Sequence, residues 1–454
     1  MLAAGLAFSI IFIAAAGFWA GGRPHRDNAL TAKLVTGLVL GTFIGGSSTI
    51  GTAQLAYRLG MPALWFCLGG AAGCLFLALA AAGPLRRSGS RTIMGVLTQR
   101  YGEASGLAAT ALNSLGTFIS ILVQLISATS ILAVVLPGMP RCAELLFAML
   151  AMTAWVVFGG SRGAGIAGLV KILLICTAML LCGLAVLDDT GGPAGFAAMV
   201  AGIPNPDGID FLNLFGRGVG TDLGACLSLV VGMATTQIYA QAIIRADTTA
   251  HAREGLVMSA LVLPLPGLCG VAAGLWMRAN CPGIVDKTAL TQFILMQFPD
   301  FTAGVFLGAL FISVVGTGAG LALGIASVIV NDVIEPHAAG RLRGLGHDGL
   351  LRLLIVLVLG AACAMCLGVR NETILLYAFA SMAFRGGGII APLSVALFTR
   401  RRASGAVAAA SMLSGAAVVL LFNVWRILPC DPLIAGMIVS AAVLAAGLRR
   451  GEAV

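Results

Sequence analysis

The sequence predicts an all-α polytopic membrane protein, and the reasons are its composition and the spacing of its apolar runs. Of the 454 residues, 59% are hydrophobic and only 10% are charged, whereas a soluble domain carries about 25% charged residues. The apolar residues gather in runs of about 20, the length that a helix needs to cross about 30 Å of hydrocarbon. The alternating segments of roughly ten residues that are typical of a membrane β-barrel are not visible in the sequence.

Thirteen apolar runs predict about 13 transmembrane helices. In chain order they are 2–20, 32–58, 63–83, 105–135, 142–158, 164–187, 220–243, 255–277, 301–331, 350–369, 373–398, 404–424 and 432–448. The first run has no charged segment before it and no obvious cleavage site, so we expect a retained helix and not a signal peptide. The outer loop 188–219 either forms a short surface helix or lid or only connects its neighbours, and 288–298 is expected to be an interfacial helix.

Basic residues decide the predicted orientation. Most of the 27 lysines and arginines lie in alternate loops, for example Arg86, Arg87 and Arg400 to Arg402, and loops rich in positive charge face the cytoplasm. We therefore expect the N-terminus outside and the C-terminus in the cytoplasm, with the chain surrounded by lipid in the plasma (inner) membrane. The net charge of +9 follows from this asymmetry. It does not indicate a nucleic-acid partner.

Reactive side chains are few, which argues against an enzyme. No CxxC motif or other metal-ligand spacing is present, and all four histidines fall in loops, so the sequence has no constellation of acid, base or metal ligand at one depth. We expect no cofactor other than a coupling ion. The sequence contains no ATP-binding motif, so a primary pump is not expected. Cys142, Cys281 and Cys430 lie near the predicted outer face and could pair, but their spacing is irregular and we expect no disulfide.

Two predicted spans contain dense clusters of small and polar residues. In the span 32–58 they are Gly41, Gly45, Gly46, Ser47, Ser48, Thr49, Gly51 and Thr52, and in 220–243 they are Gly224, Ser228, Gly232, Thr235, Thr236 and Gln237. A single pair of small residues would indicate close helix packing. In the first cluster the small residues occupy every face of the helix, which favours an unwound segment beside a protein-lined cavity. Inverted-repeat transporters place one such broken helix in each half.

The two broken spans are five spans apart, and this spacing predicts an inverted repeat (5+5) transporter core. Residues 1–31 would form a leading helix and inner loop, 32–187 the first five-helix repeat, 188–219 an outer loop, 220–398 the second repeat, and 399–454 two trailing helices. The predicted function class is a secondary transporter. A channel would typically show symmetry or repeated pore loops, which the sequence lacks. A substrate sensor that does not transport stays an alternative, which a flux assay would separate from a carrier.

Several stretches resemble the sodium:solute symporter family. "FIGGSSTIGTAQLAYRLGMPALW" (43–65) is similar to the first core helix of the family, with its break rich in glycine and serine. "FGGSRGAGIAGLVK" (158–171) resembles the connection between the fourth and fifth helices, and "LFISVVGTGAGLALGIASVIVNDV" (310–333) resembles the eighth core helix. The resemblance covers most of residues 32–400. It implies a Na⁺-coupled symporter with the five-plus-five fold, in which a small solute is moved by alternating access.

The resemblance also implies a cation site between core helices one and eight. Carried onto this sequence, its ligands are the carbonyl oxygens of Gly41, Ile44 and Ser313 and the hydroxyl of Thr317. Oxygen ligands of this kind suit a hard cation such as Na⁺.

The sequence departs from the family at this cation site. Gly316 stands where a second hydroxyl residue is usual, and Ala167 and Gly168 stand where an aspartate is usual, with Lys171 in place of a glutamine. The stem of Lys171 could snorkel to the cytoplasmic interface. Alternatively, its ammonium could approach the cation site, where it would replace Na⁺ with a fixed charge or load and unload a proton. The sequence therefore leaves Na⁺ coupling, H⁺ coupling and Na⁺-independent transport open.

Arg385 is predicted near the middle of a span, where a charge is costly. On insertion scales an arginine at the bilayer centre costs about 2.5–3.5 kcal/mol, and such residues usually face a cavity or a partner. Asp222 is the one possible carboxylate partner at a matching depth. Guanidinium binds carboxylate or sulfonate through a bidentate fork. The predicted substrate is therefore a small organic anion or a zwitterion such as an amino acid.

The remaining substrate-binding candidates are uncharged polar residues in the broken spans and their neighbours: Ser47, Ser48, Thr49, Gln124, Thr235, Thr236 and Gln237. Gln124 could instead form a hydrogen bond between helices. Phe43, Tyr239 and Phe384 are the plausible aromatic residues of the cavity, and their small number argues against a sugar. The identity of the substrate, the stoichiometry and the oligomeric state do not follow from the sequence.

Overall fold

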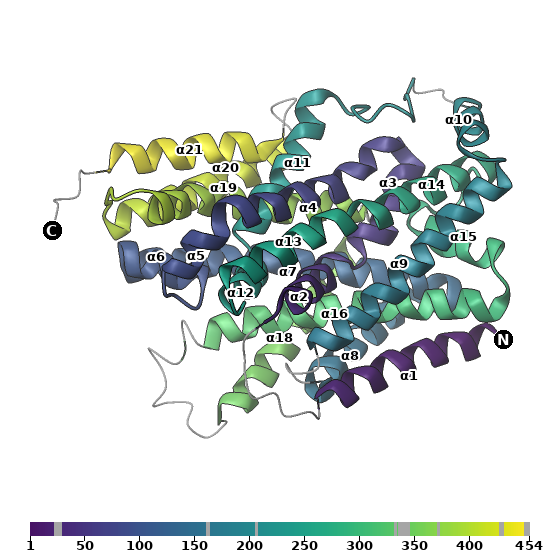
Figure 1. Cartoon of the computed structure of the whole chain (residues 1–454), viewed down its shortest axis with the longest axis horizontal. Coiled ribbons are helices and arrows are strands. Elements are labelled where there is room, and N and C mark those ends of the chain that lie inside the picture. The colour runs from purple at the N-terminus through teal and green to yellow at the C-terminus, as the bar shows by residue number, and fades with distance from the viewer. Residues whose placement is uncertain are drawn as a thin grey trace.

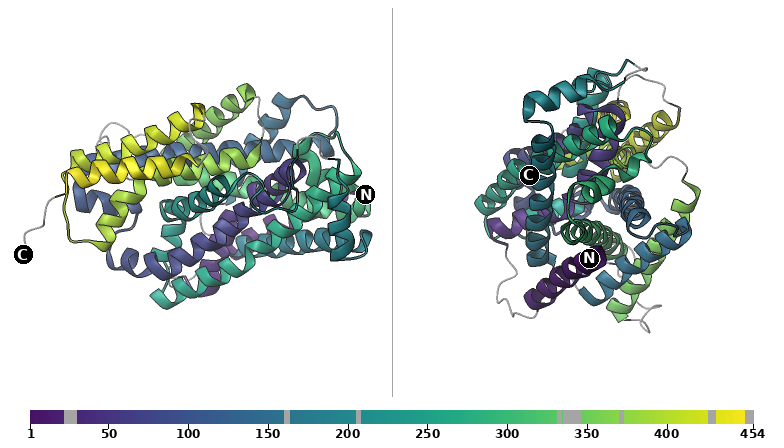
Figure 2. Two further views of the ribbon diagram at one scale, coloured as in Figure 1. Left: turned by 90° about the horizontal axis from the view of Figure 1, so that it is seen from above. Right: turned by 90° about the vertical axis from the view of Figure 1, so that its right-hand side faces the viewer.

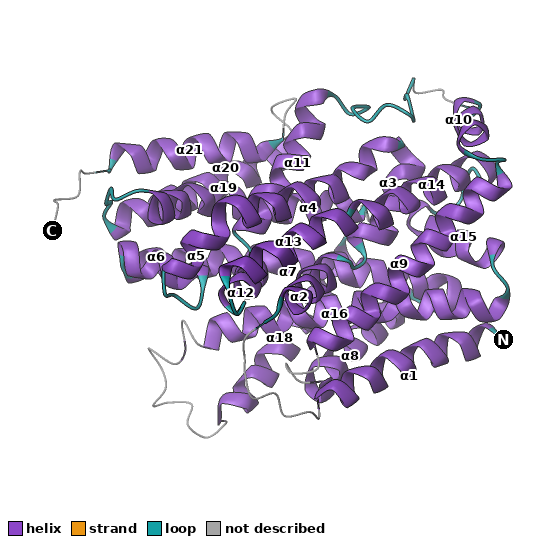
Figure 3. Cartoon of the chain, in the orientation of Figure 1, coloured by secondary structure: helices purple, strands orange, loops and turns teal. Residues whose placement is uncertain are grey.

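The described part of the chain is built from helices. The computed structural model describes residues 1–21, 30–159, 164–204, 208–330, 334, 346–369, 373–425 and 431–448. Within these residues, helices are the only regular secondary structure apart from one isolated bridge between Leu30 and Ala246 (Figure 3). Most helices follow the long axis of the molecule, so that α1 (Leu2–Gly21) begins at one end and α21 (Pro432–Ala446) finishes at the other (Figure 1).

The first six predicted spans each contain one helix or a chain of consecutive helical segments. After α1 these are α2 (Ala32–Phe43), η1 (Ser47–Gly51), α3 (Thr52–Leu59), η2 (Met61–Leu64), α4 (Trp65–Phe76), η3 (Leu77–Ala81), α5 (Ala82–Arg87), α7 (Glu103–Val135), α8 (Arg141–Gly159) and α9 (Ala164–Asp189). The short helix α6 (Ile93–Tyr101) lies in the loop before α7. The segments from Met61 to Arg87 follow one another without a sharp bend and together form one candidate span.

The later spans follow the same plan. They contain α11 (Val219–Ala234), α12 (Gln237–Ile244), α13 (Thr249–Val262), α14 (Pro264–Asn280), α16 (Asp300–Ile329), α18 (Gly346–Gly368), α19 (Ile374–Phe398), α20 (Gly405–Trp425) and α21. Two short helices lie outside these spans. The predicted outer loop contains α10 (Pro193–Ala201), and the predicted interfacial segment contains α15 (Ala289–Gln297), which follows the single turn η4 (Asp286–Thr288).

The number of membrane crossings stays a prediction. By length and composition, eight helices within the described ranges can span a membrane, or ten if each of the two bent pairs counts as one span. The surface agrees with a lipid environment, because large apolar side chains such as Leu79, Leu173 and Leu261 are 76%, 69% and 77% exposed. The chain is thus a multi-pass membrane protein. The count of 13 and the inverted repeat are consistent with this fold without being established by it.

The first broken helix bends where the glycine and serine cluster was found. α2 stops at Phe43, three residues form a turn, and the chain resumes as the π-helix η1 and then α3, with a bend of 62° between the two halves. Within the turn, the N–H of Gly45 donates to Ser48 Oγ at 3.2 Å, so Gly41 loses its usual intrahelical partner. Carbonyl groups at the end of α2 are therefore available to other side chains.

The second broken helix bends at a pair of threonines. α11 ends at Ala234, and Thr235 and Thr236 leave the helical conformation before α12 begins, with a bend of 52°. The hydroxyls of both threonines donate to carbonyls of the preceding turn of α11. This local bonding offers the backbone an alternative to a continuous helix, which accounts for the break.

The trailing helices α20 and α21 pack on α19 through backbone contacts. A Cβ placed on Gly387 would lie 3.6 Å from the Cα of Gly436, and one on Gly415 would meet the carbonyl oxygen of Gly387 at 2.5 Å. A Cβ on Gly388 would meet the carbonyl oxygen of Met412 at 2.7 Å. The three helices run side by side in two perpendicular views (Figures 1 and 2). The glycines are required here because no side chain fits between the backbones.

Candidate functional site

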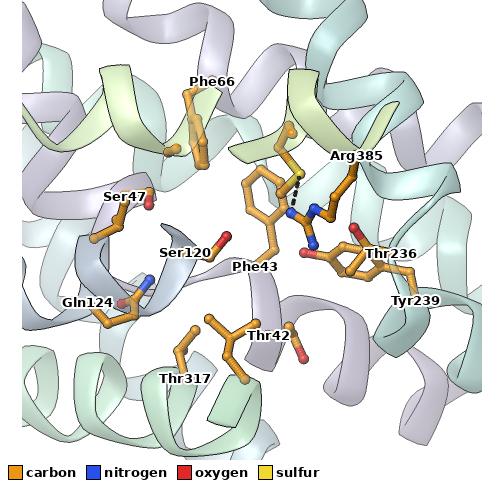
Figure 4. A pocket seen from close by; sticks show the side chains of 14 residues that line it. Thr42, Phe43, Ser47, Phe66, Ser120, Gln124, Thr236, Tyr239, Thr317 and Arg385 are labelled. Carbon is orange, nitrogen blue, oxygen red and sulfur yellow. Dashed lines mark hydrogen bonds between the residues drawn. The ribbon is translucent and has the colours of Figure 1, made fainter. Parts of the chain in front are cut away.

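A pocket lies where the two broken helices meet α7, α16 and α19. The residues that line it are Thr42, Phe43, Ser47, Phe66, Ser120, Val123, Gln124, Thr236, Tyr239, Thr317, Leu321, Ala378, Met382 and Arg385. Figure 4 shows Arg385 on one side of this space and Ser47 and Gln124 on the other. Hydroxyl, amide and aromatic groups surround a single charged side chain, which is the composition expected of a binding site for a small polar molecule.

Arg385 lies in the middle of α19 and is 1% exposed. Its hydrogen bonds go to neutral groups: Nε donates to the carbonyl of Ser381 at 3.2 Å, Nη1 to Thr117 Oγ1 at 3.2 Å and Nη2 to Ser381 Oγ at 3.1 Å. Met382 Sδ is a further neutral partner of Nη2, at 3.1 Å. The sequence had left Asp222 as a possible carboxylate partner.

Asp222 does not pair with Arg385. Its carboxylate bonds to Arg217 instead, with Nη2 and Oδ1 2.6 Å apart and Nε donating to the same oxygen. Of the ion pairs found between described residues, none includes Arg385. The guanidinium is therefore a buried charge on the wall of a pocket, held in place by neutral acceptors. A buried charge without a counter-charge is costly, and an anion in the pocket would remove that cost.

The opposite wall of the pocket is formed by the first break. The Oε1 atom of Gln124 on α7 accepts a hydrogen bond from the N–H of Gly46 at 3.1 Å. Close packing explains the adjacent glycines: a Cβ on Gly45 would lie 3.1 Å from both Gln124 Oε1 and Thr317 Oγ1, and one on Gly46 would overlap the Ser127 side chain. The glycines thus allow α7 and α16 to approach the break. Gln124 both forms the bond between helices and lines the pocket.

Lys171 on α9 reaches the end of α2. Its Nζ atom donates to the carbonyl of Gly41 at 2.8 Å, to the carbonyl of Ser313 at 3.0 Å and to Thr317 Oγ1 at 2.9 Å. These acceptors are three of the four atoms that the resemblance implied as cation ligands. The fourth, the carbonyl of Ile44, accepts from Ser313 Oγ at 2.8 Å. Since Lys171 is only 6% exposed, its side chain is directed into the protein and does not snorkel to the interface.

Four of the predicted substrate residues line the pocket: Ser47, Gln124, Thr236 and Arg385. The other four do not line it, and their side chains bond to backbone groups. The hydroxyls of Ser48 and Thr49 donate to carbonyls of their own broken helix, as does that of Thr235 in the second break. Gln237 accepts a hydrogen bond from the N–H of Ile93 at 2.9 Å, which ties α12 to α6. Phe43 and Tyr239 line the pocket, whereas Phe384 does not.

Several lining residues were missed by the sequence analysis, and helical spacing would have found some of them. Ser120 lies four residues before Gln124 on α7, and Met382 and Ala378 lie three and seven residues before Arg385 on α19. Residues at these spacings share one face of a helix. Phe66 has no comparable signal, because its helix contributes only one residue to the pocket.

The departures from the family pattern fall beside Lys171. A Cβ on Gly316 would be in ordinary van der Waals contact with the ring of Trp155, at 3.7 Å. Ala167 and Gly168 lie in the part of α9 whose side chains are outside the described residues. Of the three cysteines that could have paired, Cys142 and Cys281 carry free thiols, and Cys430 lies outside the described residues.

Comparisons with known proteins agree with one another. The family model of the sodium:solute symporter family matches residues 28–415. The sodium/pantothenate symporter of Escherichia coli is 24% identical over 94% of this chain and 90% of its own length, and a high-affinity choline transporter of Drosophila melanogaster is 22% identical over 80% of this chain and 61% of its own. An uncharacterized symporter of Bacillus subtilis is 26% identical over 38% of this chain, and the match spans only 34% of that protein.

Solved structures share the fold. A Na⁺-coupled sialic acid symporter in a substrate-bound, outward-open state is similar with a TM-score of 0.77 and 16% identity, over 98% of this chain and 96% of that one. Mhp1, a transporter of the nucleobase-cation-symport-1 family in a closed conformation, gives a TM-score of 0.60 and 11% identity over 93% and 95% of the two chains.

Proposed function

The chain belongs to the sodium:solute symporter family, and from this premise we propose that it is a secondary carrier for a small organic anion or zwitterion, such as a carboxylate or an amino acid. The observation that carries the proposal is the buried guanidinium of Arg385, which lines a pocket between two broken helices and has only neutral partners among the described residues. The carrier would work by alternating access, with the pocket opening first to one side of the membrane and then to the other.

The chemistry of the pocket supports an anionic group on the substrate. Guanidinium and carboxylate match in a bidentate fork, and Arg385 is the single charged residue of the lining. Neutral acceptors on the opposite wall, which include the hydroxyl of Ser47 and the amide oxygen of Gln124, suit the ammonium group of a zwitterion. Pantothenate and sialic acid, which are named for two of the similar proteins, are both carboxylates.

Aromatic side chains support a gate on one side of the pocket. The rings of Phe43 and Phe66 lie 5.1 Å apart, and Phe66 meets Phe379 edge-on at 5.7 Å. The guanidinium of Arg217 lies over the Phe379 ring at 5.6 Å. Apolar layers of this kind exclude water from a site, and they can separate by small rotations of the helices that carry them.

Na⁺ is the coupling ion that the family and the sialic acid symporter suggest, with the oxygens of Gly41, Ile44, Ser313 and Thr317 as its proposed ligands. A second candidate is a carrier that does not bind Na⁺ at this place, whether it is proton-coupled or Na⁺-independent. The three hydrogen bonds of Lys171 to the proposed ligands favour the second candidate.

The proposal is tested by uptake into proteoliposomes. A pooled set of radiolabelled small carboxylates and amino acids is offered to the wild-type protein and to Arg385→Gln. Removing one partner of a buried charge pair costs about 2–5 kcal/mol, so we expect the apparent affinity for the substrate to fall by about 30-fold or more. Arg385→Lys keeps the charge without the fork, and it should recover part of the loss.

Arg87→Gln is the matched control, because Arg87 is exposed and outside the pocket. It should transport like the wild type. Retention volume on a sizing column and thermal unfolding in detergent report whether each variant is folded. Undiminished uptake by Arg385→Gln would overturn the anion-binding proposal. Substrate binding without any uptake would instead identify a sensor.

A further inference from the structure

The end of α2 offers oxygen ligands to a cation. Because the break removes its intrahelical partner, the carbonyl of Gly41 in the last turn of α2 is available to a ligand, and it lies at the negative end of the helix dipole. The carbonyl of Gly41, the carbonyl of Ser313 and the hydroxyl of Thr317 converge on one point from two helices. In transporters, broken-helix carbonyls and half-helix C-termini of this kind coordinate coupling cations.

The point on which these oxygens converge is taken by the ammonium of Lys171. An ammonium group has three N–H donors, and the three acceptors lie at 2.8, 3.0 and 2.9 Å from Nζ. Each donor therefore has one partner, and the lysine is buried. The ammonium thus gives each of the three oxygens both a hydrogen bond and a nearby positive charge, and a bound cation would supply the same charge.

The residues present do not fit an additional Na⁺. An ion that shared these oxygens would lie within a few ångströms of the ammonium, and like charges at that distance repel strongly in a buried site. No carboxylate among the described residues bonds to Lys171 or to its three acceptors, so no negative charge offsets a second cation. The site has room for one positive charge, and the chain already supplies it.

We propose that Lys171 is the resident cation of this site, so that the carrier works without binding Na⁺ between α2 and α16. This inference rests on the proposed function, in that it concerns the coupling of the same carrier. The ammonium of Lys171 would then do what a Na⁺ bound at this site would do, which is to hold α2 against α16. Since Thr317 both accepts from Lys171 and lines the pocket, the ammonium also adds positive potential beside an anionic substrate.

The first test measures Na⁺ binding through its effect on stability, and it needs no substrate. Purified protein is unfolded by heat in about 0.2 M sodium chloride and in the same concentration of N-methyl-D-glucamine chloride, so that the ionic strength, and with it electrostatic screening, is the same in both salts. Wild-type protein should unfold at the same temperature in both. In Lys171→Ala the oxygens are released, and a bound Na⁺ should raise the melting temperature by about 3 °C or more, since a ligand that binds only the folded state stabilises it.

Lys33→Ala is the matched control, because Lys33 is exposed and the same atoms are removed. It should behave like the wild type in both salts. Stabilisation of the wild type by Na⁺ of about 3 °C or more would overturn the proposal. The wild-type result decides this even if Lys171→Ala fails to fold.

The second test is uptake in the absence of Na⁺. Wild-type proteoliposomes should accumulate or exchange the substrate equally, within about twofold, when N-methyl-D-glucamine replaces Na⁺ on both sides, because no Na⁺ step exists at this site. Uptake that requires Na⁺ would overturn the proposal about Lys171. If no carboxylate or amino acid is transported at all, the proposed function fails, while the unfolding measurement still decides the role of Lys171.

Discussion

Gly46 is the residue at which the first break and α7 approach most closely. A Cβ there would overlap the Ser127 side chain, so Gly46→Ala forces the break away from α7. Overpacking of this kind costs about 1–3 kcal/mol. We expect Gly46→Ala to lower the melting temperature in detergent and to weaken substrate binding, because Gln124 would also lose its bond to the Gly46 N–H.

Gly320→Ala provides the comparison for this variant. It places a methyl group on α16 where nothing lies within 4 Å, and alanine is the better helix former. It should leave the melting temperature unchanged or slightly raised. Equal effects of the two substitutions would show that helix propensity, and not contact with Ser127, decides the result.

Single residues were only partly predictable. Arg385 and Lys171 were identified because charges inside apolar runs are rare and costly. The direction of the Lys171 side chain was not predictable, since a four-carbon stem can reach either the interface or the interior, and the rotation of α9 depends on its neighbours. Ser48, Thr49 and Thr235 were assigned to the pocket by residue type. Their hydroxyls bond to nearby carbonyls instead, a choice that sequence does not reveal.

Among the elements, α3 is tied down at its far end by a polar cluster. Gln54 Nε2 donates to Asp286 Oδ1 at 3.3 Å, and Gln54 Oε1 accepts from the N–H of Ile374 at 2.9 Å. Arg58 forms an ion pair with Asp286 and donates to Thr373 Oγ1 at 2.9 Å. The cluster joins the second half of the first broken helix to η4 and to the start of α19. We infer that the cluster restrains the ends of these helices that lie on the predicted outer side, and that it opposes opening of the pocket toward that side.

Asp286→Asn should weaken this closure without changing the size of the side chain. Partly exposed ion pairs contribute about 0.2–1 kcal/mol, so the open state should gain up to about fivefold in population. Pocket access is measured as the rate at which an impermeant thiol reagent modifies Ser120→Cys, in a background that lacks the exposed Cys142. The same background without Ser120→Cys gives the blank.

Asp348→Asn serves as the control for Asp286→Asn, since Asp348 is exposed near the start of α18 and far from the cluster. It should not change the rate of modification. An unchanged or slower rate in Asp286→Asn would mean that the cluster does not hold the pocket closed.

Both broken helices followed from the sequence, because clusters of glycine, serine and threonine are poor helix formers. The conformation of the first break did not follow from the sequence. The sequence suggested an unwound segment over 45–51, whereas only Ile44 to Gly46 form a turn, and Gly51 N bonds to the carbonyl of Gly46 in a π-helix. Packing of glycines against α7 and α16 decides how many residues stay helical, and those contacts are not encoded locally.

For the whole molecule, the positive-inside rule predicts an external N-terminus and a cytoplasmic C-terminus. A green fluorescent protein fused after residue 454 should fluoresce, and alkaline phosphatase at the same place should be inactive, because the two reporters work on opposite sides of the inner membrane. Each reporter is the control for the other. An active phosphatase at the C-terminus would contradict the predicted orientation.

The fold class of the molecule was predictable because composition and run length constrain it strongly. The tertiary arrangement was not, since it depends on which faces of the helices meet. The pocket illustrates the difference. Phe66, Ser120 and Met382 come from three helices far apart in sequence, and only the packed bundle brings them to one cavity. In the sequence, each of these residues alone looks like an ordinary residue that packs one helix against another.

The glycine contacts that join α19 to α20 and α21 have a mechanical consequence. Backbones in direct contact resist separate movement, so we expect the three helices to move together, with the Arg385 guanidinium on the side of the pocket. Exposed apolar residues of this group, such as Leu413, Leu420 and Ile438, would face acyl chains in a bilayer. We therefore expect the turnover of the proposed carrier to depend on the thickness and viscosity of the membrane around it.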